Sequence, residues 1–160
     1  MVKSTFQQSE PPLPNISSTH IIRVDYGRSV EEMINEGNYN YLSESITSDN
    51  FPSNEEGVIE VLTYLVSFVS YINTQNSIAR MSSMNPPLRP ATLKELLAFG
   101  ISKPDLPQNY KITALWSNWR DLYGYMYVPC ISGDEWGRYL FLNWWRYGWY
   151  QNWQFLSVSM

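Results

Sequence analysis

The chain has 160 residues, enough for one domain with a hydrophobic core of its own. Apolar residues make up 44% of it, charged residues 16% and aromatic residues 16%, a composition that excludes an intrinsically disordered chain. The single cysteine excludes an internal disulfide and a cysteine-based zinc site, the single histidine excludes a histidine-cluster metal site, and the formal net charge of −4 singles out no class of partner. We therefore expect no metal and no other cofactor.

The first part of the chain combines an arm, a strand and a short helix. Residues 1–19 are polar, hold three prolines and lack the apolar run of a signal peptide, which predicts an extended proline-rich arm. The β-branched residues of 20–25 predict a strand. Residues 30–36 place their apolar side chains on one helical face, with Ser29 as N-cap and Gly37 as the stop. Residues 38–54 are expected to form mostly loop.

The middle of the chain holds a long apolar run and two predicted helices. In residues 58–72 seven of fifteen side chains are β-branched, which favours a buried strand, and the run is too short for a membrane span. Residues 74–84 predict a helix that ends before Pro86 and Pro87. Residues 92–99 predict a second helix, with a capping box at its start and Gly100 as its stop.

The C-terminal third is dominated by aromatic residues. All seven tryptophans lie between Trp116 and Trp153. Residues 139–144 alternate between two faces, and glycines mark turns on either side, so we expect short antiparallel strands with a last strand at 155–158. The predicted fold class is α+β, with short helices plus a small twisted antiparallel sheet with long loops, in a single domain over residues 20–160.

The aromatic residues are too many for one small sheet to bury, so some are expected to point outward. Trp145, Tyr147 and Tyr150 lie beside Arg146, Gln151 and Asn152 in WRYGWYQN, a mixture typical of protein-binding hot spots and paratopes. Core packing is the other explanation of this cluster. We expect no nucleic-acid partner, because the groove of a single-strand binder is strongly basic and this region holds few arginines.

No catalytic constellation is visible in the sequence. The glycines are isolated turn residues rather than a phosphate-binding loop. His20 is expected at the surface, and Asp134-Glu135 in a solvated hairpin turn, with no second carboxylate at a telling position. Cys130 is expected to be a buried small apolar residue. The chain is therefore predicted not to be an enzyme.

Several pieces of the chain occur in a characteristic order: LRPATLKELLAFG, KITALWSNW, YVPC, GRYLFLNWW and a terminal FLSV. Together with the earlier VDYGRSVEEMINEGNYNY and ITSDNFP, they resemble a family of small bacterial, archaeal and viral proteins with the patterns R-P-A-T-x-x-E-L-L-A, A-L-G-S-x-W and R-F-L-A-V-R. The resemblance covers about residues 20–160 and identifies the chain as similar to the variable proteins of diversity-generating retroelements. It departs from the pattern at Gln154 and Ser159, which replace arginines, and at Trp116, which replaces a glycine.

This resemblance implies a C-type-lectin-like fold of the branch that includes formylglycine-generating-enzyme-like domains. It also implies that a retroelement diversifies a C-terminal region, about residues 116–152, that forms a ligand site. The implied scaffold residues are Leu140, Leu142, Trp144, Trp149, Phe155, Leu156 and Val158. The implied diversified residues are Trp116, Asn118, Arg120, Phe141, Asn143, Arg146, Tyr147, Tyr150, Gln151 and Asn152. Calcium-dependent sugar binding is not expected, since the nearest motif is Lys103-Pro104-Asp105, and a lone Cys130 argues against formylglycine-generating activity.

The leading hypothesis is a non-enzymatic ligand-binding protein, of receptor or adhesion type, with a hypervariable surface that recognises an unknown protein or cell-surface ligand. The sequence leaves the location open between a virion and a microbial cell surface, and no membrane insertion is expected. One alternative is a sugar-binding or small hydrolytic module that uses the tryptophans and tyrosines with Asp134 or Glu135. Another is a structural subunit of a virion, docked by the arm.

Overall fold

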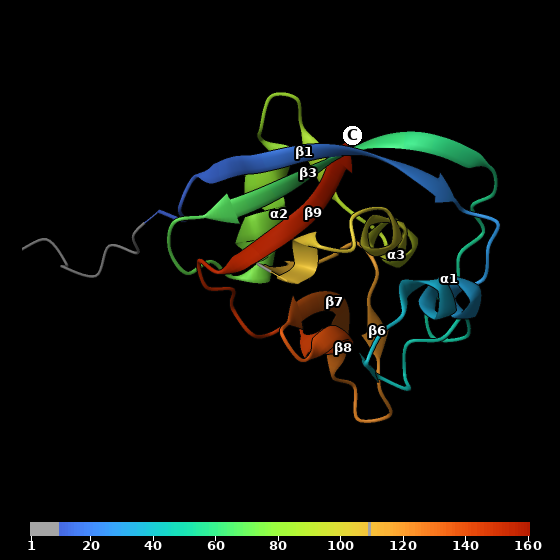
Figure 1. Ribbon diagram of the computed structural model, residues 1–160. Helices are drawn as coiled ribbons and strands as arrows, with labels where there is room; N and C mark the ends of the chain where they lie inside the picture. The colour runs from blue at the N-terminus through green and yellow to red at the C-terminus, as the bar shows by residue number, and fades with distance from the viewer. Residues whose placement is uncertain (1–9, 109) are drawn as a thin grey trace, which may run out of the picture.

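The computed structural model describes residues 10–108 and 110–160. In them nine strands form one sheet, in the order β1-β3-β9-β5-β7-β8-β2, with β4 added beside β9 and β6 beside β7 (Figure 1). The strands are β1 (Pro14–Asp25), β2 (Tyr41–Leu42), β3 (Val58–Phe68), β4 (Leu88–Pro90), β5 (Lys111–Thr113), β6 (Trp119–Arg120), β7 (Met126–Asp134), β8 (Gly137–Trp144) and β9 (Trp153–Ser159). The helices are α1 (Val30–Gly37), α2 (Thr74–Ser82) and α3 (Leu93–Ser102), with a 3₁₀ turn at Leu106–Gln108.

The predicted fold class is wrong. Instead of helices beside a small antiparallel sheet, the described chain is built on one large mixed sheet, in which β5 runs parallel to β9 and β2 runs parallel to β8. The C-type-lectin-like fold was part of the same prediction and falls with it. The sheet is larger than predicted because β1 and β3, separated by a helix and a loop, pair over their whole length, from Pro14 opposite Phe68 to Asp25 opposite Val58. Local periodicity cannot reveal such a distant pairing.

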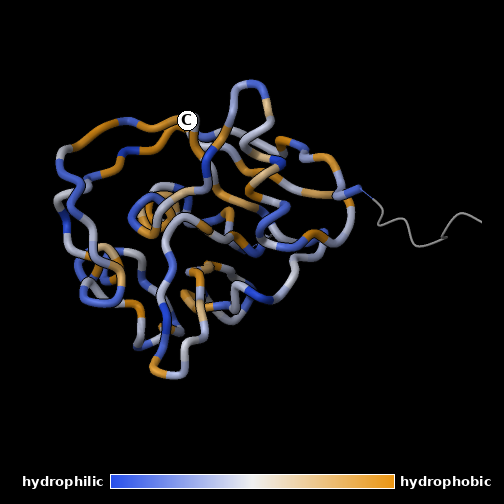
Figure 2. Tube along the Cα trace, turned by 180° about the vertical axis from the view of Figure 1, so that it is seen from behind, coloured by the Kyte–Doolittle hydropathy of each residue, from blue (hydrophilic) through white to orange (hydrophobic). Residues whose placement is uncertain are grey.

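The N-terminal boundary also differs from the predicted one. Residues 1–9 of the predicted arm lie outside the described residues. Residues 14–19, also assigned to the arm, form the first half of β1. From here β1 and β3 run together as a long antiparallel pair, along which apolar and polar stretches follow one another in Figure 2.

The helices begin as their sequences predict. The Ser29 side chain accepts a hydrogen bond from the Glu32 amide at the start of α1, and Thr92 and Glu95 form a complete capping box at the start of α3. The expected stop at Gly100 is wrong, because α3 continues to Ser102. Gly100 lies inside the helix where the Tyr39 hydroxyl approaches, and a Cβ at this position would lie 2.7 Å from that oxygen. The glycine therefore allows close packing rather than a turn.

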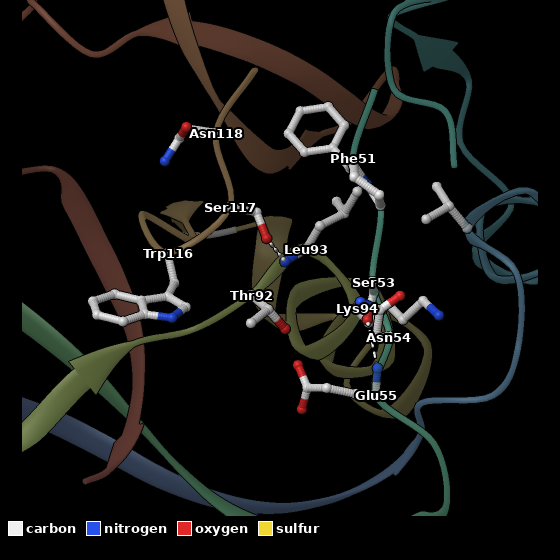
Figure 3. Close-up of a pocket in the computed structure, with 12 residues that line it drawn as sticks. Phe51, Ser53, Asn54, Glu55, Thr92, Leu93, Lys94, Trp116, Ser117 and Asn118 are labelled. Atoms are coloured by element: carbon white, nitrogen blue, oxygen red, sulfur yellow. Dashed lines mark hydrogen bonds between the residues drawn. The ribbon is translucent and has the colours of Figure 1, made fainter. Parts of the chain in front are cut away.

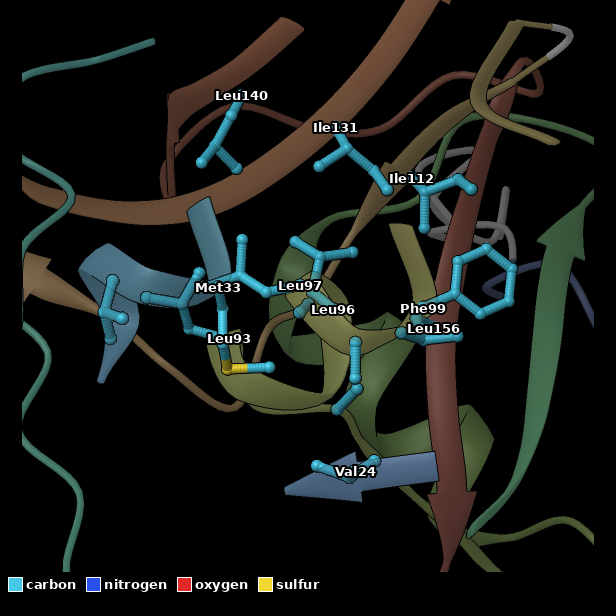
Figure 4. Packing of buried hydrophobic residues seen from close by; sticks show 14 of the residues in the cluster. Val24, Met33, Leu93, Leu96, Leu97, Phe99, Ile112, Ile131, Leu140 and Leu156 are labelled. Atoms are coloured by element: carbon cyan, nitrogen blue, oxygen red, sulfur yellow. The ribbon is translucent and has the colours of Figure 1, made fainter. Parts of the chain in front are cut away.

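Two apolar clusters cover opposite faces of the sheet. The first gathers α1 and α3 against inward residues such as Leu65 of β3 and Leu156 of β9, and Figure 4 shows α3 at its centre. The second includes Met81 of α2 and the adjacent residues Val66 and Phe155 of the same two strands. Since neighbouring residues of a strand point to opposite faces, these central strands are buried on both sides.

A buried carboxylate joins three parts of this core. Glu95 of α3 is 0% exposed. Its two oxygens accept a bidentate pair of 2.9 Å hydrogen bonds from the Arg89 guanidinium, one of 2.8 Å from the Thr92 amide and one of 2.7 Å from the Tyr26 hydroxyl. Burial alone would raise the pKa of Glu95, but the hydrogen bonds from Arg89, Thr92 and Tyr26 outweigh it and hold the pKa below its ordinary value. The charged form therefore stabilises the fold.

We predict that Glu95→Gln lowers the free energy of unfolding by about 3 kcal/mol, because it leaves the Arg89 charge without its partner. Urea denaturation at neutral pH measures this loss. Because the pKa of Glu95 is depressed in the folded state, its contribution is complete above the ordinary carboxyl pKa and disappears as the pH falls through the folded value. The difference between wild type and variant should therefore narrow in acid.

Glu32→Gln is the matched control, since Glu32 is exposed and its ion pair with Arg28 is long, at 3.8 Å. We expect this change to alter the free energy of unfolding by less than about 0.5 kcal/mol. Equal losses in the two variants would show that Glu95 is no more important to the fold than a surface carboxylate.

Candidate ligand-binding surface

A row of aromatic side chains crosses one end of the sheet. Tyr127 of β7 lies opposite Trp144 of β8 on one side and opposite Trp119 of β6 on the other. The ring centroids of Tyr127 and Trp119 are 5.7 Å apart, and Trp144 stacks against Tyr125 at 4.9 Å and contacts Tyr147 at 5.0 Å. We call Trp119, Tyr125, Tyr127, Trp144 and Tyr147 the aromatic strip. Its rings touch one another at distances typical of favourable aromatic pairs, so the strip is held in a fixed arrangement.

A tight hairpin between β6 and β7 extends the strip. The Asp121 carboxylate accepts hydrogen bonds from the amides of Tyr123 (2.9 Å) and Tyr125 (3.0 Å) and from the Tyr127 hydroxyl (3.3 Å). Gly124 has a φ of 86°, which closes the turn. Leu122 at the tip of this hairpin is fully exposed and Tyr123 beside it is 87% exposed. An apolar pair is thus presented to solvent by an ordered turn, which is a feature of interaction sites rather than of packing.

A hollow lies at the Trp119 end of the strip. It has a volume of about 370 Å³ and is lined by Trp119, Tyr127 and Asp121, by Phe141 and Leu142 of β8, and by residues of the segment from Tyr41 to Ser45. It is within the size range of sites that take a side chain or a small ligand. The strip and the hollow share Trp119 and Tyr127 and together form one candidate surface.

A second, larger cleft of about 540 Å³ lies at the start of α3 (Figure 3). Its walls come from four parts of the sequence: Val30 of α1, residues 51–55, residues 92–94 and residues 116–118. The Ser117 hydroxyl accepts a 2.7 Å hydrogen bond from the Leu93 amide, which fixes two of these segments to each other. We call this hollow the α3 cleft.

The structure divides the eleven predicted site residues among different places. Trp116 and Asn118 line the α3 cleft, whereas Tyr147 belongs to the strip. Five further residues are exposed: Arg120, Arg146, Tyr150, Gln151 and Asn152. Arg120 donates a 2.8 Å hydrogen bond to the Gly124 carbonyl and so helps to hold the hairpin.

The other three predicted site residues are partly buried. Phe141 lines the hollow beside the strip, but its ring also lies 6.3 Å from that of Trp153. Trp145 packs against the second apolar cluster. The Asn143 side chain accepts a 3.1 Å hydrogen bond from the Trp144 amide. The scaffold therefore holds Phe141, Trp145 and Asn143 more closely than is expected of side chains that point outward.

Several residues of the strip and the hairpin were not predicted from the sequence as site residues. Leu122, Tyr123, Tyr125 and Tyr127 were assigned no role, and Trp144 was placed in the scaffold although it lies in the strip. The sequence did contain a signal for the hairpin: Asp121 and Gly124 are separated by two residues and flanked by aromatic ones, which is typical of a turn closed by an aspartate side chain.

Metal-ligating side chains are not clustered in the described residues. No group of three or more histidine, cysteine, aspartate or glutamate side chains in them could hold a metal ion. Cys130 is buried, as expected, and burial raises its pKa to about 12, which keeps the thiol protonated. Asp134 accepts hydrogen bonds from the Trp136 amide and the Tyr139 hydroxyl, which explains it as a turn residue. No helix of the described chain is long and apolar enough to cross a membrane.

Comparisons with known proteins give no match to any family model, any curated protein or any solved structure. The likeness to retroelement variable proteins therefore depends on the sequence motifs alone. We infer the role of the site from the geometry of the site itself.

We predict that Asp121→Ala loosens the hairpin, because the amides of Tyr123 and Tyr125 lose their acceptor, while Asp121→Asn keeps an acceptor oxygen and preserves most of the order. Hydrogen exchange of the two amides, followed by NMR, should be at least about tenfold faster in the alanine variant, corresponding to the roughly 1.5 kcal/mol of one hydrogen bond to a charged group. Identical exchange in all three proteins would mean that the backbone alone holds the hairpin.

Proposed function

We propose that the chain is a non-enzymatic binding protein whose aromatic strip and hairpin tip contact the surface of another protein. The observation that carries this proposal is the exposure of Leu122 and Tyr123 at the end of an ordered hairpin that continues into stacked aromatic rings. Leaving a large apolar side chain in water forgoes roughly 1.5–3 kcal/mol of folding free energy. A fixed cluster of such side chains is therefore better explained by a partner than by the fold.

The composition of this surface also favours a protein partner. Tyrosine and tryptophan bring large contact areas at a low cost in side-chain entropy, and Arg120 and Arg146 lie at or near the strip. Because the rings already face one another within the strip, little order has to be gained on binding. The strip is carried by β7 and β8, whose residues Val128, Cys130 and Leu140 are buried, so its position is set by the core.

We further propose that this surface is diversified by a retroelement, in line with the sequence resemblance. The support is the close alternation of exposed and buried residues between 116 and 152. Tyr147 and Tyr150 are exposed, while Trp149 between them is fully buried and its indole Nε1 donates a 2.8 Å hydrogen bond to Thr74. Substitution at the exposed positions would leave the core intact, as a diversified site requires.

Sequencing the gene and its flanks across the source population tests this proposal. We expect substitutions to concentrate at codons for exposed residues of the region, such as Arg120, Tyr123, Tyr147 and Tyr150, and to spare the buried Cys130, Leu140 and Trp149. A reverse transcriptase gene and an imperfect template repeat should lie nearby.

Two results would contradict diversification. One is a region as invariant as the rest of the gene, without a neighbouring retroelement; the surface would then be specific for one fixed partner. The other is variation spread equally over exposed and buried codons, which would indicate loss of constraint instead of selection on a surface.

A further inference from the structure

The α3 cleft has the chemistry of a ligand site of its own. Segment 116–120 separates it from the strip: Trp116 and Asn118 line the cleft, whereas Trp119 packs against Tyr127 in the strip. Its volume of about 540 Å³ lies in the range of small-molecule sites. The cleft can therefore be occupied independently of the strip.

Some polar groups of the cleft serve the fold. The Thr92 hydroxyl accepts a hydrogen bond from the Glu95 amide, the Ser117 hydroxyl accepts one from the Leu93 amide, and the Ser53 hydroxyl accepts one from the Glu55 amide. The Ser117–Leu93 bond joins two walls of the cleft, whereas the other two bonds are local to the start of α3 and to residues 53–55. All three use the short polar side chains.

Other polar groups of the cleft are uncommitted. The side-chain amides of Asn54 and Asn118 and the carboxylate of Glu55 make no hydrogen bond or salt bridge to any described residue. Lys94 uses one of its three donors, toward the Tyr26 carbonyl at 2.7 Å. Figure 3 shows Trp116 on one side of the cleft and Lys94, Asn54 and Glu55 on the other. A ligand here meets both hydrogen-bond donors and hydrogen-bond acceptors.

Trp116 supplies the apolar part of the cleft. Its indole is 53% exposed and makes no aromatic pair with another described residue. Its open face contrasts with the rings of the strip, which contact one another. A flat apolar ring face opposite two amides and two opposite charges suits a ligand that has one apolar face and hydroxyl groups around its edge.

We propose that the α3 cleft binds a neutral saccharide unit, with its carbon–hydrogen face on Trp116 and its hydroxyl groups hydrogen-bonded to Asn118, Asn54, Glu55 and Lys94. An anionic ligand would meet the Glu55 carboxylate, and a cationic one would meet the Lys94 ammonium. A wholly apolar ligand would leave all four polar side chains without partners, which is costly. The cleft is separate from the aromatic strip, and its ligand is set by this chain's own Trp116 and Asn118, which lie in the region proposed to be diversified.

The test is a titration of the purified chain with neutral monosaccharides, namely glucose, galactose, mannose, fucose and N-acetylglucosamine. Binding is followed by saturation-transfer NMR and by tryptophan fluorescence. We expect at least one sugar to bind, with contacts through its ring hydrogens. Trp116→Ala and Asn118→Ala should each weaken binding at least about tenfold, equivalent to about 1.4 kcal/mol.

Trp136→Ala is the matched control, because Trp136 is 79% exposed and lies in the turn between β7 and β8, outside the cleft. It should leave sugar binding unchanged, as should Tyr147→Ala in the strip. Asn118→Ala removes an exposed side chain with no bond to the described protein, so it separates lost contacts from lost folding, which thermal unfolding of each variant also checks.

Three results would overturn the proposal. The first is the absence of binding by any of the five sugars up to roughly tens of millimolar, where even a site of about 4 kcal/mol would be occupied. The second is sugar binding that survives both Trp116→Ala and Asn118→Ala. The third is stronger binding of sialic acid or glucosamine, which would refute the charge argument. None of these results bears on the strip.

Discussion

The whole structure depends on β9, the last strand, which joins its two halves. In the strand order β9 lies between β3, on the side of the long β1–β3 pair, and β5, on the side that carries the aromatic strip. Residues 153–158 are buried, with Phe155 in one apolar cluster and Leu156 in the other. Because its partners come from segments far back in the chain, the sheet closes only when nearly the whole chain has been assembled, which makes folding dependent on long-range contacts.

This closure allows aromatic residues to serve two purposes within a few positions of each other. Trp149, Trp153 and Phe155 pack edge to face in the core, and the polar atom of Trp149 has its partner in Thr74. Tyr147 is held in the strip, and the Tyr150 ring pairs edge to face with that of Tyr71. The residues that stabilise the fold and those that are offered to a partner therefore alternate along one loop.

Local physics made part of this structure predictable. The helix starts at Ser29 and Thr92 and the strands around 58–68 and 153–159 follow from capping residues and β-branched or alternating patterns. The strands β2, β4, β5 and β6 are two or three residues long, too short for any periodicity, so the size of the sheet was missed. Alternation correctly placed Phe141 and Leu142 on opposite faces of β8. It could not show that both faces of β8 are partly covered by other residues. Nor could it show that Trp144, on the core-side face, lies in the aromatic strip. The residues that were predicted to point outward therefore match only part of the exposed surface.

The central claim is that the fold carries its recognition surface without relying on it for stability. A display library in which single positions from 116 to 159 are randomised, sorted for resistance to protease, tests this claim most directly. Resistance should survive nearly all substitutions at Leu122, Tyr123 and Tyr147 and be lost by most substitutions at Trp149 and Phe155, since only the latter two create cavities in the core. Equal sensitivity at the two groups of positions would show that the exposed aromatic residues are part of the fold's own support, and would contradict the account.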